Sequence, residues 1–367
     1  MSILRLPTIW RQRQRPNALE FSILAKLPPE LLVLVAEFLP PVSAIAFSLC
    51  CRLLYSLVAA KHLRRASHNP RFRTYDLLAL LERDLPDLLA CFTCKKFHAI
   101  KRAERFISSN NYYDGGTERP KPLCLQVEDR RAWYIYPGFS VTVFRMATKR
   151  YRQSADYLSL LNLLSSKWQI SYHAGHIGKM TASSKIVRGS LLVRAQSVFP
   201  VQPGKSTMFL LAQGHLICPH YNWREHEPAY YARLTSELEK RCHQENFQAW
   251  GVLMQCKYCA TEFQLDIQDF GKLGRLVFFT KWQYLGTGRR PLDNQWQTHL
   301  SSRRGPIWRR SSFRARSIRA GFEGKREFVF DSLMAPEHKI ALFSLPLESP
   351  WTKDNELYIS HLSDDFF

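Results

Sequence analysis

Two pairs of prolines frame a short apolar segment in the first part of the chain, and this segment constrains the fold more than any other stretch. Prolines 28–29 stand where a helix would begin, because proline has a preset φ and its missing N–H is not needed in the first turn. Prolines 40–41 should end that helix, since the residue before a proline is disfavoured in helical geometry. The pattern predicts a helix over 30–39 and, with Ser43 as N-cap, a second helical segment after it.

The first predicted helix is apolar nearly all round, with Glu30 and Glu37 as its charged residues, and must bury more than one side. A protein core, a membrane or a partner protein could supply that burial. A membrane span needs about 20 continuous apolar residues, whereas Glu37 and prolines 40–41 interrupt this segment. No secretory signal precedes it. The segment is therefore predicted to pack one face in its own domain and offer the other to a partner.

This stretch resembles the F-box family. The resemblance lies in the order and spacing of Leu27, Pro28, Glu30, Leu31, Leu32, Val35, Leu39, Pro40, Ala44, Ile45, Leu49, Cys51, Arg52 and Leu57. It implies a three-helix module over 24–62 that docks on a Skp-type adaptor and so on a cullin-RING ubiquitin ligase. The apolar anchors for that docking would be Leu27, Pro28, Leu31, Leu32, Val35, Leu39, Ile45, Leu49 and Cys51.

Composition points to a globular chain with an anion-seeking surface. The chain has 367 residues, 46% hydrophobic and 13% aromatic, which is enough for one large domain beside a small module. Its net charge of +21 favours nucleic acid, phosphate or acidic peptide as partners.

The predicted fold class is α+β, with the helical module followed by a mixed, strand-rich domain that carries one or two candidate zinc sites. Helical spacing marks 75–89, 151–168 and 228–246. The stretch 132–143 suggests strand or extended structure, and strands are predicted at 185–201, 206–217, 250–257, 261–267 and 275–284. The resulting organisation is a mobile basic leader (1–23), the module (24–62), a helical segment with a first Cys/His set (63–130), the strand-rich body with a second set (131–300), a basic loop (301–327) and a C-terminal segment (328–367).

The nine cysteines are read as thiols or metal ligands, because nothing indicates entry to an oxidising compartment. Cys50, Cys51 and Cys242 lie on predicted apolar helix faces, where a thiol behaves as a small hydrophobe. The other six form two sets with nearby histidines: Cys218, His220, Cys256 and Cys259, and, less securely, Cys91, Cys94, His98 and Cys124. Each set offers the four ligands of a closed structural zinc site, and Cys256 and Cys259 occupy the turn of a predicted hairpin. Buried thiols with chance spacing are the alternative.

The family resemblance extends into these sets. The runs 80–98, 215–220, 256–263 and 278–296 resemble blocks of a group of fungal F-box proteins, in which a further cysteine follows the histidine of the first set. On this ground Cys124 is assigned to the first set. Some relatives carry a second cysteine near that position, where this chain has 125–127 as Leu-Gln-Val, so the first set depends on His98.

A basic run follows the body and suggests a second function. Its arginines are Arg303, Arg304, Arg309, Arg310, Arg314, Arg316 and Arg319, interleaved with aromatics. The run is either a mobile loop or an anion-binding surface. No hydrolase, metalloprotease, P-loop or dinucleotide motif is present, so catalysis is not expected.

The leading hypothesis is a non-catalytic F-box substrate receptor that presents a target, acidic or phosphorylated, to the ligase in the nucleus or cytoplasm. The alternative is a basic, zinc-containing nucleic-acid-binding protein.

Overall fold

The chain divides into two compact units, Met1–Ala99 and Ile100–Phe367. The computed structural model describes residues 22–68, 74–107, 124, 134–173, 176–201, 217–221, 253–289, 294–299, 313–314, 316–324, 337, 340 and 342–344. Most of the predicted leader, the predicted strand at 206–217 except for its last residue, the predicted helix at 228–246 and most of the C-terminal segment lie outside these residues.

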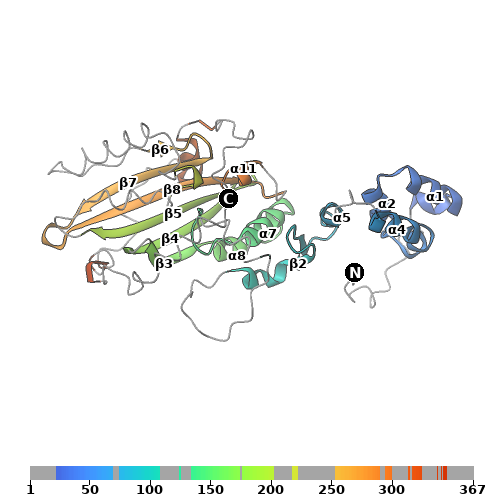
Figure 1. The fold of residues 1–367 in the computed structure, drawn as a ribbon, viewed down its shortest axis with the longest axis horizontal. Coiled ribbons are helices and arrows are strands. Elements are labelled where there is room, and N and C mark those ends of the chain that lie inside the picture. The colour runs from blue at the N-terminus through green and yellow to red at the C-terminus, as the bar shows by residue number, and fades with distance from the viewer. Residues whose placement is uncertain are drawn as a thin grey trace. The chain divides into compact units, whose positions relative to one another are not determined.

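Helices dominate the N-terminal unit (Figure 1). They are η2 (Ile23–Lys26), α1 (Pro29–Phe38), α2 (Pro41–Ser48), α3 (Arg52–Leu54), the π-helical turn η3 (Tyr55–Ala59), α4 (Ala60–His68) and α5 (Thr74–Leu81). The prolines place the first two helices as predicted, but α2 begins at Pro41 with Pro40 as its N-cap, and Ser43 lies inside it. The prediction of Ser43 as N-cap was wrong because a proline at the first helical position already starts the helix.

The helices α2, α4 and α5 enclose the core of this unit. Ile45, Ala66 and Leu77 are buried together there, and Leu63 and Leu81 pack against them. The helix α5 ends at Leu81, before the predicted end at residue 89, and a turn leads to the antiparallel strands β1 (Leu88–Ala90) and β2 (Phe97–Ala99).

The C-terminal unit is built on a six-stranded antiparallel sheet in the order β3-β4-β5-β8-β7-β6, which confirms the strand-rich prediction. The strands are β3 (Ser166–His173), β4 (His176–Val187), β5 (Ser190–Val201), β6 (Met254–Gln255), β7 (Thr261–Asp269) and β8 (Arg275–Gly286) (Figure 1). The helical elements are η4 (Ile100–Phe106), α7 (Val141–Arg152), α8 (Leu158–Leu163), η6 (Pro219–Tyr221), η7 (Gly271–Leu273), α11 (Asn294–Gln297), α12 (Ser317–Glu323) and η9 (Leu342–Ser344).

Three local predictions in this unit were wrong in whole or in part. The apolar run 139–143 begins helix α7, where Ser140 Oγ accepts the N–H of Val143 at 3.2 Å as an N-cap. The predicted helix 151–168 contains the end of α7, all of α8 and the start of β3. The predicted single strand 185–201 contains the end of β4, a turn and all of β5, so the prediction holds for 190–201 and missed the turn, where Arg188 and Gly189 adopt φ of 50° and 80°.

The two faces of the sheet differ in chemistry. Arg194, Trp282 and Glu262 are register neighbours and project from one face, because alternate residues of a strand point to opposite sides. The residues between them, which include Phe263 and Lys281, project from the other face. Among the described residues, no helix is both long enough and apolar enough to cross a membrane.

Candidate docking surface and metal centres

The helix α1 presents an apolar stripe to solvent. Leu31, Leu34, Val35 and Phe38 are 43%, 46%, 40% and 83% exposed, and they recur at the spacing of one helix face. Leu32 and Ala36, on the opposite face, are 1% and 0% exposed. Contiguous exposed apolar side chains of this kind mark an interaction site.

The predicted docking residues divide between this surface and the interior. Leu32 and Ile45 are buried in the unit, so they support the surface from within, whereas Leu31, Val35 and Pro28 are exposed. Those of intermediate exposure are Leu27, Leu39, Leu49 and Cys51. The predicted docking residues did not include five further apolar residues that are exposed: Leu34, Phe38, Leu53, Tyr55 and Leu57. Leu34 and Phe38 could have been found, because they follow Leu31 at the three- and four-residue spacing of one helix face.

An ion pair holds α1 to the later helix α4. Lys61 Nζ donates to Glu37 Oε1, and this contact keeps the pKa of the Glu37 carboxyl below its usual value. Glu37 lies between Val35 and Phe38 in sequence, and both partners of the pair are solvent-exposed.

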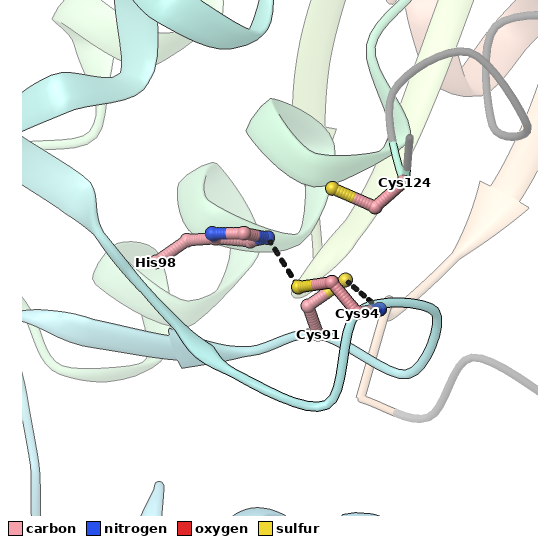
Figure 2. A group of neighbouring side chains, drawn as sticks. All are labelled: Cys91, Cys94, His98 and Cys124. Atoms are coloured by element: carbon pink, nitrogen blue, oxygen red, sulfur yellow. Dashed lines mark hydrogen bonds between the residues drawn. The ribbon is translucent and has the colours of Figure 1, made fainter. Parts of the chain in front are cut away.

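The first predicted metal set comes together in the structure. Cys91, Cys94, His98 and Cys124 each place one ligand atom within 4.8 Å of the others (Figure 2). Cys91 and Cys94 occupy the turn between β1 and β2, where the Cys94 N–H donates to Cys91 Sγ at 3.4 Å. His98, on β2, places Nε2 3.5 Å from Cys94 Sγ. Cys91 and Cys124 are buried, and Cys94 and His98 are partly exposed.

The second set also comes together and is buried throughout. Cys218, His220, Cys256 and Cys259 place their ligand atoms within 4.8 Å of one another. Cys256 and Cys259 flank the turn between β6 and β7, which confirms the predicted hairpin, and the Tyr258 N–H donates to Cys256 Sγ at 3.4 Å. His220, on η6, brings Nδ1 3.7 Å from Cys256 Sγ. The three thiols belong to an apolar cluster with Phe199, Phe263 and Phe279.

The donor separations in both sets suit a tetrahedral ion. With Zn–S near 2.3 Å and Zn–N near 2.05 Å, tetrahedral angles put sulfur and nitrogen about 3.6 Å apart. The sulfur–nitrogen distances of 3.5 Å and 3.7 Å agree with that value. All six cysteines are free thiols.

The thiols of the second set already differ in acidity. Burial raises the pKa values of Cys218 and Cys259. At Cys256 burial acts in the same direction, but hydrogen bonds with Cys218, Cys259 and His220 outweigh it and lower the pKa of Cys256. In the first set, the hydrogen bond with Cys94 and then burial raise the pKa of Cys91 to about 12. A thiolate is the form that binds metal, so the hydrogen bonds among these four side chains favour the metal-binding form within the group.

The predicted anion-binding arginines are only partly described. Arg303, Arg304, Arg309 and Arg310 lie outside the described residues, and Arg314 and Arg316 are exposed. The segment 317–323 of the predicted basic loop forms α12. Arg319, on this helix, lies over the Trp282 ring and donates through Nη1 to Gln264 Oε1 at 3.0 Å. Its guanidinium is therefore engaged with the sheet.

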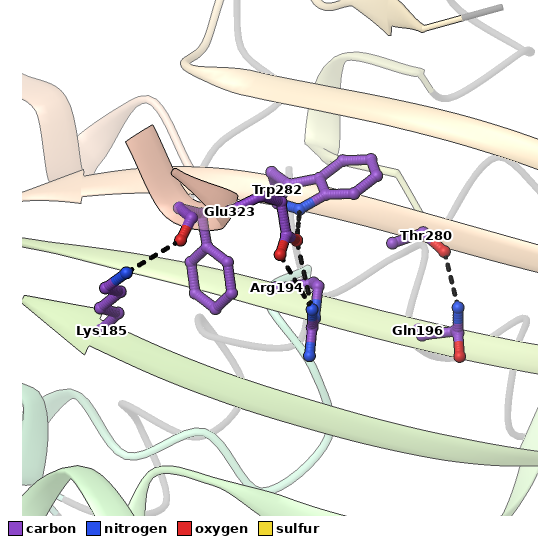
Figure 3. Close-up of polar contacts among 7 residues, drawn as sticks. Lys185, Arg194, Gln196, Thr280, Trp282 and Glu323 are labelled. Carbon is purple, nitrogen blue, oxygen red and sulfur yellow. Dashed lines mark hydrogen bonds and ion pairs between the residues drawn. The ribbon is translucent and has the colours of Figure 1, made fainter. Parts of the chain in front are cut away.

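Helix α12 is fastened to the sheet by partly buried polar contacts. Glu323 accepts hydrogen bonds from Arg194 Nη1 at 3.2 Å and from Trp282 Nε1 at 2.7 Å (Figure 3). Lys185 Nζ donates to the carbonyl oxygen of Phe322 at 3.1 Å, and Gln196 and Thr280 pair further along the same face. Such a set of contacts explains how a seven-residue helix is held in place.

Comparison with known proteins identifies one part of the chain. No curated protein matches the chain, and no solved structure does. Residues 24–66, which include α1, α2 and most of α4, match the model of the F-box domain. The chain therefore carries an F-box domain in its N-terminal unit.

Proposed function

We propose that this protein is a substrate receptor of a cullin-RING ubiquitin ligase, and that its F-box domain docks on a Skp-type adaptor. F-box domains bind such adaptors in cullin complexes, and the exposed stripe of Leu31, Leu34, Val35 and Phe38 supports the same use here. The receptor would catalyse nothing itself. By holding a target beside the ubiquitin-loaded enzyme, it would raise the effective concentration of the target. Such a role belongs inside the cell, in nucleus or cytoplasm.

Aspartates on the stripe test this docking. The double variant Leu31→Asp/Val35→Asp should weaken adaptor binding by more than about 100-fold, because two carboxylates would be desolvated in an apolar interface. Both positions are at least 40% exposed, so the domain itself should stay folded. Binding of the purified chain to the adaptor by calorimetry is the measurement.

A variant elsewhere controls for the added charge. Leu273→Asp places an aspartate at a site 48% exposed in the C-terminal unit and should leave adaptor binding unchanged. Wild-type affinity in the Leu31→Asp/Val35→Asp variant would show that the stripe is not the docking surface.

We further propose that both Cys/His groups hold structural Zn²⁺. The four donors of each group, their separations and the hairpin turns that carry the paired cysteines support this assignment. A closed site with four protein ligands stabilises a fold and leaves no open position for catalysis.

Metal content tests the zinc proposal. The purified chain should hold about two zinc ions, and Cys91→Ser and Cys256→Ser should each remove about one, since a structural site rarely survives loss of a thiolate. Cys50→Ser is the control, because Cys50 is an exposed thiol outside both groups. Zinc content near zero in the wild-type protein would rule out both sites.

The charge of the chain supports a target with acidic chemistry. A net charge of +21 and the exposed Arg314 and Arg316 favour an acidic or phosphorylated protein, and nucleic acid shares the same electrostatic preference. Identification of the proteins that co-purify with the chain separates these targets.

A further inference from the structure

Lys281 is a cation in the interior of the C-terminal unit. It lies in the middle of β8 and is 6% exposed. Its Nζ donates to the carbonyl oxygen of Tyr134 at 2.8 Å. Lysine is almost never this deeply buried unless a negative charge is near.

The register of the sheet puts Lys281 beside the second metal group. Lys281 is directly opposite Phe263 on β7, and Phe279, two residues away on β8, projects from the same face. Phe263 and Phe279 pack in one cluster with Cys218, Cys256 and Cys259. The lysine therefore projects from the sheet face on which the three thiols lie.

The electrostatics of Lys281 agree with this position. Burial lowers the pKa of Lys281 to about 7, and the sulfurs of Cys218 and Cys259 act in the opposite direction, towards the charged ammonium.

We propose that Lys281 is the charge-balancing partner of the metal site formed by Cys218, His220, Cys256 and Cys259. The inference rests on the proposed binding of Zn²⁺ there. Three thiolates and one Zn²⁺ leave one net negative charge, since the imidazole is neutral. A buried net charge is costly, and one ammonium on the same face makes the assembly neutral. Lys281 acts on the metal through the ligands and is a positioning residue, not a ligand.

Gln283 provides a matched control on the same strand and the same face. Its Nε2 donates to the same carbonyl oxygen, that of Tyr134, at 3.2 Å, and its side chain is fully buried. Gln283→Leu removes a hydrogen bond to Tyr134 without removing a charge. A role of Lys281 in merely holding Tyr134 would therefore be shared by Gln283, whereas a role in charge balance would not.

Zinc release from the full-length chain tests the proposal. A Cys94→Ser background limits the signal to the second site, and a chromophoric chelator reports the release rate. Lys281→Met should release zinc about 10-fold to 100-fold faster, the usual effect of losing an outer-shell partner. Lys281→Gln, which keeps a donor but no charge, should do the same. Lys281→Arg and Gln283→Leu should release zinc at nearly the parent rate.

The release rates of these variants either support or overturn charge balance by Lys281. Fast release from both neutral variants and slow release from Lys281→Arg and Gln283→Leu support charge balance. Release of zinc from Lys281→Gln at the parent rate overturns the charge-balance role of Lys281 while leaving the zinc site in place. If Lys281→Met does not fold, the result for Lys281→Gln alone tests the proposal. Equal acceleration in Lys281→Met and Gln283→Leu also overturns it, in favour of the contact with Tyr134. If the Cys94→Ser protein contains no zinc, the second site does not bind the metal, and both the zinc proposal for that site and the role of Lys281 are wrong.

Discussion

His299 is a buried base that must stay neutral in the folded protein. It is 0% exposed, and its Nε2 makes a hydrogen bond of 3.0 Å with the carbonyl oxygen of Tyr284, which fixes Nε2 as the protonated nitrogen. Burial lowers the pKa of His299 to about 4 from 6.5, and His220 and Lys281 act in the same direction. The Tyr284 carbonyl and Cys256 oppose the shift.

We predict that this histidine makes the fold sensitive to acid. Below pH 6.5 the unfolded chain takes up a proton on His299 that the folded chain binds only near pH 4. The stability that the folded protein gains from keeping His299 neutral is fully present above pH 6.5. It is lost as the pH falls from 6.5 towards 4, which lowers the free energy of unfolding by up to about 3 kcal/mol. Urea unfolding of wild type and His299→Gln over this range is the measurement, and the variant should lose less stability. Parallel curves for the two proteins would contradict the prediction.

At the residue scale, the sequence predicted which side chains come together better than it predicted their surroundings. Paired cysteines and a nearby histidine are a recognisable ligand pattern, and the family resemblance added Cys124 to the first set. The structure brings each set together. The burial of Lys281 and the contact of Arg194 with Glu323, 129 residues away, could not be predicted, since they depend on strand register and on the position of α12.

The end of β8 packs closely against helix α7 at a glycine. Gly288 has a φ of +61°, and a Cβ built there would lie 2.9 Å from Thr148 Oγ1 and 3.0 Å from Phe144 Cζ. Gly271 has a φ of +60° with no atom within 4 Å of the same Cβ. The two positions share a backbone conformation and differ in the space around them.

We predict that Gly288→Ala destabilises the protein more than Gly271→Ala. Alanine at positive φ should cost about 1–2 kcal/mol at either site. At Gly288 the overpacking against α7 should add about 1–3 kcal/mol. The difference in the free energy of unfolding between the two variants measures this packing directly. Equal losses would mean that α7 can move away without cost.

At the element scale, the predictions were right where a residue type restricts the backbone to few conformations. Prolines 28–29 and 40–41 located α1 and the break after it, because proline is compatible with few positions in a helix. The start of α7 was misread as a strand, because Phe139, Val141 and Val143 alternate, and the helical spacing of Val143, Ala147 and Tyr151 becomes visible only further along the chain. The hairpin at Arg188 was missed because an arginine with φ of 50° is not a recognised turn residue.

At the scale of the whole molecule, the chain combines a helical unit that carries the F-box domain with a separate sheet unit. The strand-rich class of the second unit could be predicted from composition and alternation. The order β3-β4-β5-β8-β7-β6 could not, because β5 pairs with β8 across some 75 intervening residues and no local pattern specifies that partner. The exposed stripe on α1 lies in the first unit and the second Cys/His group lies wholly in the second unit, so adaptor binding and the integrity of the sheet should respond differently to loss of the ion of that second group.

We predict that metal removal separates them. The exposed stripe on α1 contains no residue of either Cys/His group, so dialysis of the purified chain against a strong chelator should leave its affinity for the Skp-type adaptor within about twofold of the original.

The second group lies in the apolar cluster of Phe199, Phe263 and Phe279, so loss of its ion should leave buried thiols without their partner and loosen β6 and β7. Limited proteolysis should then cut the segment 253–269 rapidly, and added Zn²⁺ should restore protection. Cys50→Ser protein treated in the same way controls for thiol chemistry outside the groups. Loss of adaptor binding in step with protection would show that the docking unit depends on the metal, and unchanged proteolysis would show that the sheet does not.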